Sequence, residues 1–452
     1  MAPSEASGPP RRREFLKSAL LAGGALAVPR AARAQPPADD RPPNVVLIIS
    51  DDQHWGDYGF MGHPVVRTPR LDRLAAESVL FTRGYVAAPL CCPSLASIVT
   101  GLHPHQHKVT SNDPPRVPGE RGWGPKRLAL RRQVIAHIDE VPTLPRLLKA
   151  RGYVSHQSGK WWLGHHSRGG FTHGMTHGDP ERGGRHGDAG LAIGRKTMQP
   201  IADFLDAAGD RPFFIWYAPF LPHSPHNPPK RLLEKYRDKT ESLHVARYWA
   251  MCEWFDATCG QLLDLVDERG LRERTVVLYV CDNGWIQRPD SRRFAPRSKR
   301  SRFDGGVRTP IMVRWPGRVE PRRDETTPVS SIDLAPTLLA ACGLERAPRM
   351  QGLNLLDRAA LDDRAAVFGG VYTHDANDIH RPARNLLWRW CVSGWWKLCL
   401  PHRPNVPEGE PELYDLQADP HEKKNLAAEH PRVVARLRAL IDDWYNPPER
   451  EG

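Results

Sequence analysis

Uninterrupted runs of apolar and β-branched residues predict the strands of this 452-residue chain. The two clearest runs are Asn-Val-Val-Leu-Ile-Ile at 44–49 and Thr-Val-Val-Leu-Tyr-Val at 275–280, and 213–217 and 311–315 are further candidates. Apolar runs without polar alternation are typical of strands buried on both faces of a parallel sheet. We therefore expect the two clearest runs to be buried strands of a parallel sheet, and the other two segments to be further strands.

Segments with helical periodicity lie between these runs. Thr68-Pro69 begins a helix with Leu71, Leu74 and Ala75 on one face, and residues 143–150 form another that Gly152 ends. Residues 243–268 are the longest helical stretch. Strands that alternate with helices predict an α/β fold, with a large, mostly parallel sheet flanked by helices.

The pattern changes after about Gly343. Residues 388–400 read as short strands, and residues 431–444 carry apolar side chains at helical spacing. We therefore expect a catalytic domain over 42–345 and a smaller C-terminal α+β subdomain over 346–452.

The first 34 residues have the pattern of a targeting signal. The sequence Arg-Arg-Glu-Phe-Leu-Lys at 12–17 resembles a twin-arginine export signal, and an apolar run (19–28) and an Ala-Arg-Ala cleavage site (32–34) follow it. The apolar run is too short for a permanent membrane anchor. These features predict a signal peptide over 1–34 and a periplasmic or secreted protein.

Composition fits a globular protein with anionic partners. The formal charge is +12, and it remains +8 without residues 1–34. A basic surface favours an acidic polysaccharide, a phosphate ester or nucleic acid. The chain has no zinc-finger, basic-zipper or RNA-binding motif, so no nucleic-acid partner is expected. The eight cysteines show no zinc-site spacing, and their pairing stays open.

Oxygen-bearing side chains follow the two clearest strands. Asp51 and Asp52 come after the first strand, and Asp282 and Asn283 come after the later one. In an open α/β sheet, ligands bind beyond the carboxyl ends of the strands. Four oxygen ligands gathered there suit Ca²⁺ or Mg²⁺, although Asp and Asn also cap turns and helices.

A thiol precedes a predicted helix in the segment 89–101. Cys91 lies two residues before Pro93, where free N–H groups and the helix dipole attract an anion. A thiol in that position is a candidate nucleophile. The alternative is that Cys91 and Cys92 are two buried core residues.

Taken together, these segments resemble the formylglycine-dependent sulfatases of the alkaline phosphatase superfamily. The resemblance runs from about Pro43 to the C-terminal helix. Seven short segments carry it in the family's order: 44–52, 91–101, 152–164, 222–225, 282–284, 299–310 and 412–416.

The resemblance implies a site and a chemistry. Cys91 would be oxidised to formylglycine (3-oxoalanine) by a formylglycine-generating maturation enzyme, and its hydroxyl would also contact the metal. Asp51, Asp52, Asp282 and Asn283 would bind the cation, Ca²⁺ in preference to Mg²⁺. Lys160 and Lys299 would bind the sulfate oxygens, and His223 would protonate the leaving alcohol.

The chain departs from the family pattern at two positions. Leu95 stands where the family usually has arginine, and Trp162 stands where a histidine is common two residues after the lysine. His107, His165, His166 and Arg308 are candidates for replacing the lost polar contacts.

Three polar loops are candidates for recognising the substrate. Loops on a rigid scaffold often carry specificity, but ordinary turns have the same composition. Their candidate residues are Asn112, Asp113, Arg185, His186, His374 and Asp375.

The sequence therefore predicts hydrolysis of a sulfate ester, on a sulfated carbohydrate from outside the cell. One alternative is a phosphodiesterase or phosphonate hydrolase of the same superfamily, because phosphate and sulfate present similar oxygens to a metal and two lysines. Another alternative is a protein that binds sulfated glycans without hydrolysing them. The departures from the family pattern at Leu95 and Trp162 favour this alternative.

Overall fold

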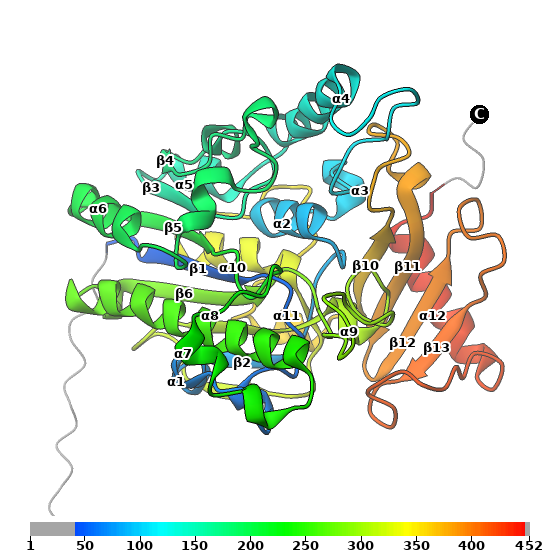
Figure 1. Ribbon diagram of the computed structural model, residues 1–452. Coiled ribbons are helices and arrows are strands. Elements are labelled where there is room, and N and C mark those ends of the chain that lie inside the picture. The colour runs from blue at the N-terminus through cyan, green and yellow to red at the C-terminus, as the bar shows by residue number, and fades with distance from the viewer. Residues whose placement is uncertain (1–40, 448–452) are drawn as a thin grey trace, which may run out of the picture. The chain divides into compact units, whose positions relative to one another are not determined.

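A nine-stranded sheet lies at the centre of the chain (Figure 1). The computed structural model describes residues 41–447, so the predicted signal peptide over 1–34 lies outside the described residues. The strand order is β4-β3-β5-β1-β6-β7-β2-β8, and β9 pairs with β2. The strands are β1 (Asn44–Ser50), β2 (Val79–Tyr85), β3 (Val154–Gly159), β4 (His173–Gly174), β5 (Phe213–Ala218), β6 (Thr275–Cys281), β7 (Arg308–Arg314), β8 (Arg322–Asp324) and β9 (Val329–Ser330).

The sheet is mixed but mostly parallel, which confirms the predicted fold class. Strands β4, β3, β5, β1 and β6 pair in parallel, and β7 runs antiparallel to both β6 and β2. All four strands predicted from apolar runs are present. Their completely buried side chains explain why polar alternation is missing from the sequence.

Helices cover both faces of the sheet. They are α1 (Pro69–Ala76), α2 (Cys91–Thr100), α3 (Pro104–His107), α4 (Pro125–Ala136), α5 (Leu144–Lys149), α6 (Gln199–Ala208), α7 (Lys230–Leu233), α8 (Leu243–Glu268), α9 (Asp304–Val307), α10 (Leu334–Ala341), α11 (Arg358–Asp362) and α12 (Pro431–Trp444). Side chains of α2, α5 and α10 share one apolar cluster, and those of α1, α6 and α8 share another. Strand β1 supplies Leu47 to the first cluster and Ile48 to the second, as the period of two requires.

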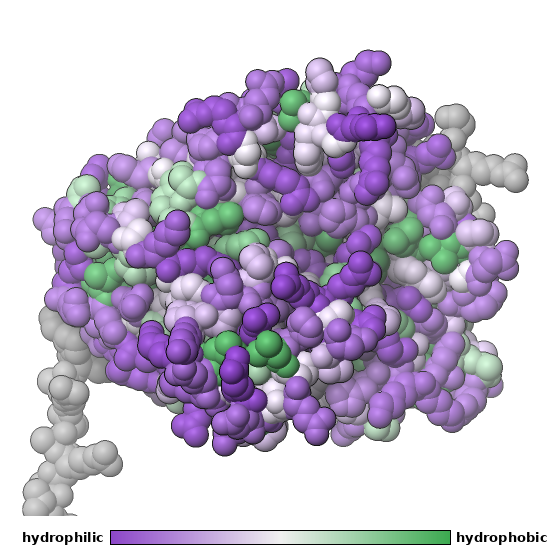
Figure 2. Space-filling view, in the orientation of Figure 1, coloured by the Kyte–Doolittle hydropathy of each residue, from purple (hydrophilic) through white to green (hydrophobic). Residues whose placement is uncertain are grey.

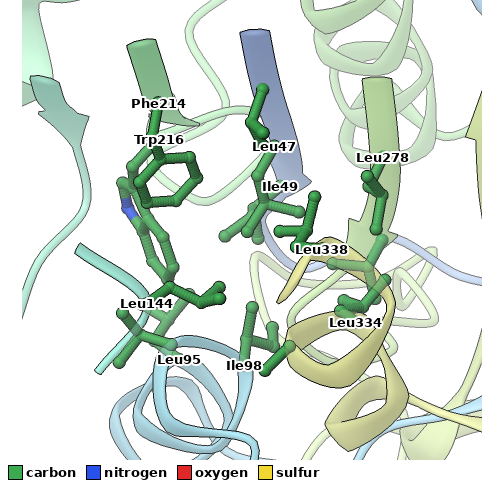
Figure 3. Packing of buried hydrophobic residues seen from close by; sticks show 14 of the residues in the cluster. Leu47, Ile49, Leu95, Ile98, Leu144, Phe214, Trp216, Leu278, Leu334 and Leu338 are labelled. Carbon is green, nitrogen blue, oxygen red and sulfur yellow. The ribbon is translucent and has the colours of Figure 1, made fainter. Parts of the chain in front are cut away.

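The first cluster fixes helix α2 against the sheet. Figure 3 shows Leu95 and Ile98 of this helix facing Leu47 and Ile49 of β1, with Leu338 of α10 beside them. All five side chains are buried. The packing sets the position of the first turn of α2, where Cys91 lies.

A second, antiparallel sheet forms the C-terminal part, in the order β10 (Val367–Tyr372), β11 (Leu386–Ser393), β12 (Trp396–Pro401) and β13 (Glu412–Asp415). Helix α12 packs on β11 and β12. Buried Lys397 of β12 contacts Asp304 of α9 at 2.8 Å and Glu422 at 2.9 Å, which joins this sheet to the catalytic part. The boundary at 345/346 stays a prediction.

The surface is predominantly polar. Figure 2 shows hydrophilic residues over most of the visible face, with hydrophobic residues in scattered groups. None of the described helices is long and apolar enough to cross a membrane. All eight cysteines, which lie within the described residues, are buried and unpaired.

Candidate active site

The ends of β1 and β6 bring the oxygen-bearing side chains together. Ser50 and Cys281 are register partners, so the residues that follow them lie side by side. The backbone N–H of Asp52 donates to Asp282 Oδ1 at 3.1 Å. Asn283 Nδ2 donates to Asp52 Oδ1 at 2.6 Å. The juxtaposition expected from two equivalent strand ends is therefore present.

The donor set fits a divalent cation. Oδ2 of Asp51, Oδ2 of Asp52 and Oδ1 of Asn283 are buried and accept no hydrogen bond from any described residue. Ligand atoms of Asp51, Asp52, Cys91 and His223 all lie within 4.8 Å of one another. Buried oxygens without a donor carry a large desolvation cost, which a hard cation such as Ca²⁺ or Mg²⁺ offsets.

Asp282 differs from Asp51, Asp52 and Asn283 because both of its carboxylate oxygens have a hydrogen-bond partner. Its Oδ1 accepts the Asp52 amide, and its Oδ2 lies 3.3 Å from Lys160 Nζ. Burial raises the pKa of Asp282 to about 7, although Lys160 opposes that shift. Both oxygens thus contact groups of the same cluster.

Two buried lysines close the cluster. Lys160 Nζ lies 2.6 Å from Asp51 Oδ1, and Lys299 Nζ lies 2.6 Å from Asp52 Oδ1 and 3.1 Å from Cys91 Sγ. Burial lowers the pKa of each ammonium, but the nearby carboxylates outweigh burial and raise both above the usual value. Both lysines therefore keep their charge at neutral pH, which suits an anionic substrate group.

The thiol of Cys91 is a weak nucleophile as it stands. It lies in the first turn of α2 and is 1% exposed. Burial raises its pKa to about 11, against the opposing effect of Lys160 and Lys299. Burial raises the pKa of neighbouring Cys92 to about 12. Both thiols are therefore protonated at neutral pH, whereas the thiolate is the reactive form.

His223 presents one ring nitrogen to the cluster. Its Nδ1–H donates to the carbonyl of Ser224 at 2.6 Å, and its Nε2 lies 3.3 Å from Asp52 Oδ2. The ring stacks on Phe220 with centroids 4.2 Å apart. Burial lowers the pKa of His223, and Asp51 and Asp52 partly oppose this. A ring fixed through one nitrogen, with the other at the reacting centre, is suited to proton transfer.

The candidate substrate loops converge beside this cluster. Asp113 forms an ion pair with Arg185, whose Nε lies 2.9 Å from Asp113 Oδ1. Ligand atoms of Asp113, His374 and Asp375 lie within 4.8 Å of one another. His186 lies near Lys160. Burial lowers the pKa of His186 to about 3, and the positive charge of Lys160 contributes to this shift. The three loops thus form one wall of the site.

Asn112 has an internal contact instead. Its Oδ1 accepts the backbone N–H of Cys92 at 2.8 Å, and the residue is 4% exposed. The carboxamide therefore fixes the start of α2, next to the nucleophile position.

The two departures from the family pattern have different structural settings. Leu95 belongs to the apolar cluster between α2 and the sheet (Figure 3), so its side chain packs in the core. Trp162 is buried, and the Arg185 guanidinium lies 4.7 Å from its ring. A cation therefore stacks on the ring that replaces the family's histidine.

None of the four residues suggested as replacements contacts Cys91 or the carboxylates of the cluster in the described chain, which corrects that expectation. His107 contacts Ser97 Oγ, and Arg308 donates to the carbonyl of Thr82. The other two have local partners: His165 contacts Ser167, and His166 contacts the Thr176 carbonyl.

Sequence reasoning missed Arg131 of α4. This side chain is 1% exposed, and its guanidinium donates to the carbonyls of Asn112 at 3.0 Å, Arg185 at 3.1 Å and Trp162. One cation thereby ties together three segments of the site wall. The surrounding sequence, Leu-Ala-Leu-Arg-Arg-Gln, reads as an ordinary helix with exposed arginines and gave no signal of this.

Comparison with known proteins agrees with this geometry. The sulfatase family model matches residues 43–344, and a model for the C-terminal part of N-sulphoglucosamine sulphohydrolase matches 297–444. The chain is 31% identical to N-acetylgalactosamine-6-sulfatase of Canis lupus familiaris, over 70% of this chain and 68% of that protein. It is 30% identical to human arylsulfatase A, over 88% of this chain and 87% of that protein.

Solved structures show the same fold at low sequence identity. One, a complex with its substrate D-glucosamine-2-N,6-O-disulfate, aligns with a TM-score of 0.68 at 18% identity, over 91% of this chain and all of that one. The phosphonate monoester hydrolase of Agrobacterium radiobacter aligns with a TM-score of 0.63 at 18% identity, over 88% of this chain and 96% of that one. The family model spans most of the chain, and the chain therefore belongs to the sulfatase family, whose activity is hydrolysis of sulfuric esters.

Proposed function

We propose that the chain hydrolyses sulfate esters on a sulfated carbohydrate through a formylglycine made from Cys91. The observation that carries this proposal is the charge arrangement around Cys91. Two buried lysines that keep their charge, and three buried oxygens without donors, surround a residue that is a poor nucleophile as a thiol. This arrangement suits a sulfate group, a cation and a modified nucleophile.

The chain's own residues have separate tasks in this proposal. Asp51, Asp52, Asp282 and Asn283 hold one divalent cation, because their donors are all oxygens; we expect Ca²⁺ in preference to Mg²⁺. Lys160 and Lys299 neutralise the sulfate oxygens. His223, in its cationic form with both ring nitrogens protonated, gives the Nε2 proton to the leaving alcohol and keeps the Nδ1 proton on the Ser224 carbonyl. Formylglycine supplies, as a hydrated aldehyde, one hydroxyl for attack on sulfur and a second for regenerating the aldehyde.

Four observations support a carbohydrate substrate. The dog relative is named for a sulfated amino sugar, and a fold neighbour is bound to glucosamine disulfate. An ulvan-active sulfatase of Formosa agariphila is 24% identical over 85% of this chain. The basic charge, +8 without the proposed signal peptide, favours a polyanionic substrate.

Turnover measurements test the proposal. Protein purified from its native host is assayed for kcat/KM on nitrophenyl sulfate, on defined sulfated oligosaccharides and on phosphate mono- and diesters. We expect sulfate esters to be the best substrates, Cys91→Ala to be inactive and Cys92→Ala to remain active. A preference for phosphate diesters or phosphonates would establish the second candidate function, which the fold neighbour from Agrobacterium radiobacter favours. Binding of sulfated oligosaccharides without turnover would establish the glycan binder.

Maturation and export are part of the proposal. A formylglycine-generating enzyme would act on Cys91, and peptide mass analysis should show the aldehyde or its hydrate there and a thiol at Cys92. Unmodified Cys91 in a protein that hydrolyses sulfate esters would disprove this route.

Replacing Arg12 and Arg13 by lysine should keep the precursor in the cytoplasm, and an unchanged periplasmic yield would contradict twin-arginine export.

A further inference from the structure

A basic pocket lies on the loop that carries His223. This cavity of about 310 Å³ is formed by the 225–228 segment, by residues of α7 and α8, and by the loop after β6. Its polar lining consists of His226, Asn227, His244, Arg247 and Arg292, and no Asp or Glu lines it. The volume is at the lower end of the roughly 300–1,000 Å³ typical of small-molecule sites.

Among the described residues, the two arginines of the basic pocket have no charged partner. The side chains of Arg247 and Arg292 form no hydrogen bond or ion pair with another residue in the described range 41–447. His226 Nε2 is buried and also lacks a partner there. Guanidinium groups gathered without a counter-charge repel one another unless an anion binds between them, and their planar N–H groups match carboxylate and sulfate oxygens.

The basic pocket adjoins the reacting centre. His226 follows His223 by three residues, and the charges of His223 and Asp52 both act on its ring. The His226 ring also contacts Trp285, with centroids 5.7 Å apart, and Lys299 Nζ lies 5.8 Å from that indole ring. A short path of side chains therefore connects the pocket to the lysine beside Cys91.

One side chain fixes the pocket relative to the proposed proton donor. Arg195 donates to Asn227 Oδ1 at 3.1 Å and to the carbonyl of His223 at 3.3 Å. Asn227 lines the pocket, and His223 faces the cluster. Since His223 would protonate the leaving oxygen, the pocket lies on the side of the site that the sugar occupies.

We infer that the basic pocket binds a second anionic group of the substrate, a sulfate or carboxylate beside the sulfate ester that is cleaved. This inference rests on the proposed function and deepens it. The pocket makes the protein selective for multiply charged glycans, because a sugar with a single sulfate leaves Arg247 and Arg292 without a partner. Loss of two charge-assisted hydrogen bonds corresponds to at least a tenfold weaker affinity.

Binding without turnover tests the inference directly. In a Cys91→Ala background, Kd is measured by calorimetry for disaccharides with one sulfate, with two sulfates, and with one sulfate and one uronic acid. We expect a doubly charged ligand to bind at least tenfold more tightly than its singly sulfated counterpart, and Arg247→Gln/Arg292→Gln to abolish that preference. The two doubly charged ligands distinguish a sulfate from a carboxylate as the bound group.

Arg293→Gln is the matched control. Arg293 is the exposed neighbour of Arg292 and does not line the pocket, so its variant should keep the preference. Arg292→Gln alone changes an exposed side chain and tests the pocket if the double variant unfolds; it should reduce the preference severalfold. A preference absent from the Cys91→Ala protein, or retained in the double variant, would overturn the inference. Turnover of nitrophenyl sulfate by protein with Cys91 intact tests the proposed function separately, since that substrate has no second anionic group.

Discussion

At the scale of single residues, His223 couples the reacting centre to the basic pocket. Its ring nitrogens have different surroundings: the Ser224 carbonyl fixes Nδ1, and Asp52 faces Nε2. Its backbone carbonyl is held by Arg195, which also holds Asn227 of the pocket. The same residue therefore combines a chemical task with a position in the substrate-binding loop.

His223→Ala should impair sugar sulfates much more than an activated aryl ester. A poor leaving alcohol needs a proton in the transition state, and general acid catalysis typically contributes about 10²- to 10⁴-fold. We expect kcat to fall by about that factor on a sulfated disaccharide and by no more than about tenfold on nitrophenyl sulfate. An equal loss on both substrates would mean that His223 acts in sulfate binding or in folding.

Asp282→Ala should lose the metal and the activity together. The variant removes one proposed oxygen ligand and one of the two carboxylates that contact Lys160. Metal content measured by plasma mass spectrometry should fall from about one equivalent to near zero, because the cation loses one of its three proposed carboxylate ligands. Asp256→Asn is the control: this buried carboxylate of α8 lies at the start of α1, and the variant should keep its metal.

Which residues form the site was predictable only where a motif surrounded them. Asp51, Lys160 and His223 each lie in a short pattern that the sequence displays, and the structure brings them together. Arg131 lies in no such pattern, because the burial of an arginine depends on carbonyls from three distant segments. The internal contact of Asn112 with Cys92 is equally invisible in a polar loop.

At the scale of elements, helix α2 contacts charged side chains at its first turn and the apolar core on its inner side. Its first turn carries Cys91 beside two lysines, and its inner side packs Leu95 and Ile98 into the core (Figure 3). This packing against the core explains why the fold accommodates a leucine at position 95.

Leu95→Arg should destabilise the protein by at least about 3 kcal/mol. The substitution places a charge without a partner among buried apolar side chains, which is among the costliest single changes. The free energy of unfolding from urea denaturation measures the effect. Leu95→Met, which keeps the volume and polarity of the site, should cost less than about 1.5 kcal/mol. A stable and more active Leu95→Arg protein would show that the new side chain turns toward the site.

Helices α1 and α8 are joined by a carboxylate whose protonation should affect stability. Asp256 accepts the backbone N–H groups of Arg70 at 3.3 Å and Leu71 at 2.7 Å. Burial raises its pKa to about 7, although those two hydrogen bonds oppose the shift. The unfolded chain has the lower, ordinary value, so the folded state holds an extra proton between about pH 4 and pH 7.

The stability of the protein should therefore fall as pH rises through this window. The contribution of Asp256 is fully present below about pH 4 and is lost by about pH 7. Relative to Asp256→Asn, which does not titrate, the wild type should lose about 2 kcal/mol of unfolding free energy between pH 5 and pH 7. Parallel pH profiles of the two proteins would contradict this.

Strands with purely apolar runs were predictable, and strands with polar residues were not. Strands β1 and β6 are apolar along their length, whereas β3 reads Val-Ser-His-Gln-Ser-Gly. Its polar side chains are buried because partners exist: Ser158 Oγ donates to the Trp216 carbonyl, and Gln157 Nε2 donates to the Gly159 carbonyl. Burial of this kind depends on neighbouring strands that the local sequence does not describe.

At the scale of the whole molecule, the two sheets share buried groups. Tyr85 and Phe303 of the catalytic part lie in one apolar cluster with Val367 and Trp390 of the second sheet. The alternation of strands and helices predicted the first sheet and its class. The continuous core between the sheets was not predictable. After Gly343 the alternation of strands and helices gives way to short strands, and such a change is typical of a domain boundary.

Under the proposed maturation, the burial of Cys91 would impose an order on the production of active enzyme. In the folded chain this side chain is 1% exposed, in the first turn of α2 and beside Lys299, where a maturation enzyme would not reach it. The proposed oxidation would therefore have to occur before the chain has folded. Oxidation and folding would then compete, and a chain that folded first would stay inactive. The active fraction of a preparation would be fixed by these two rates rather than by an equilibrium, and faster synthesis would yield as much folded protein with less activity per molecule.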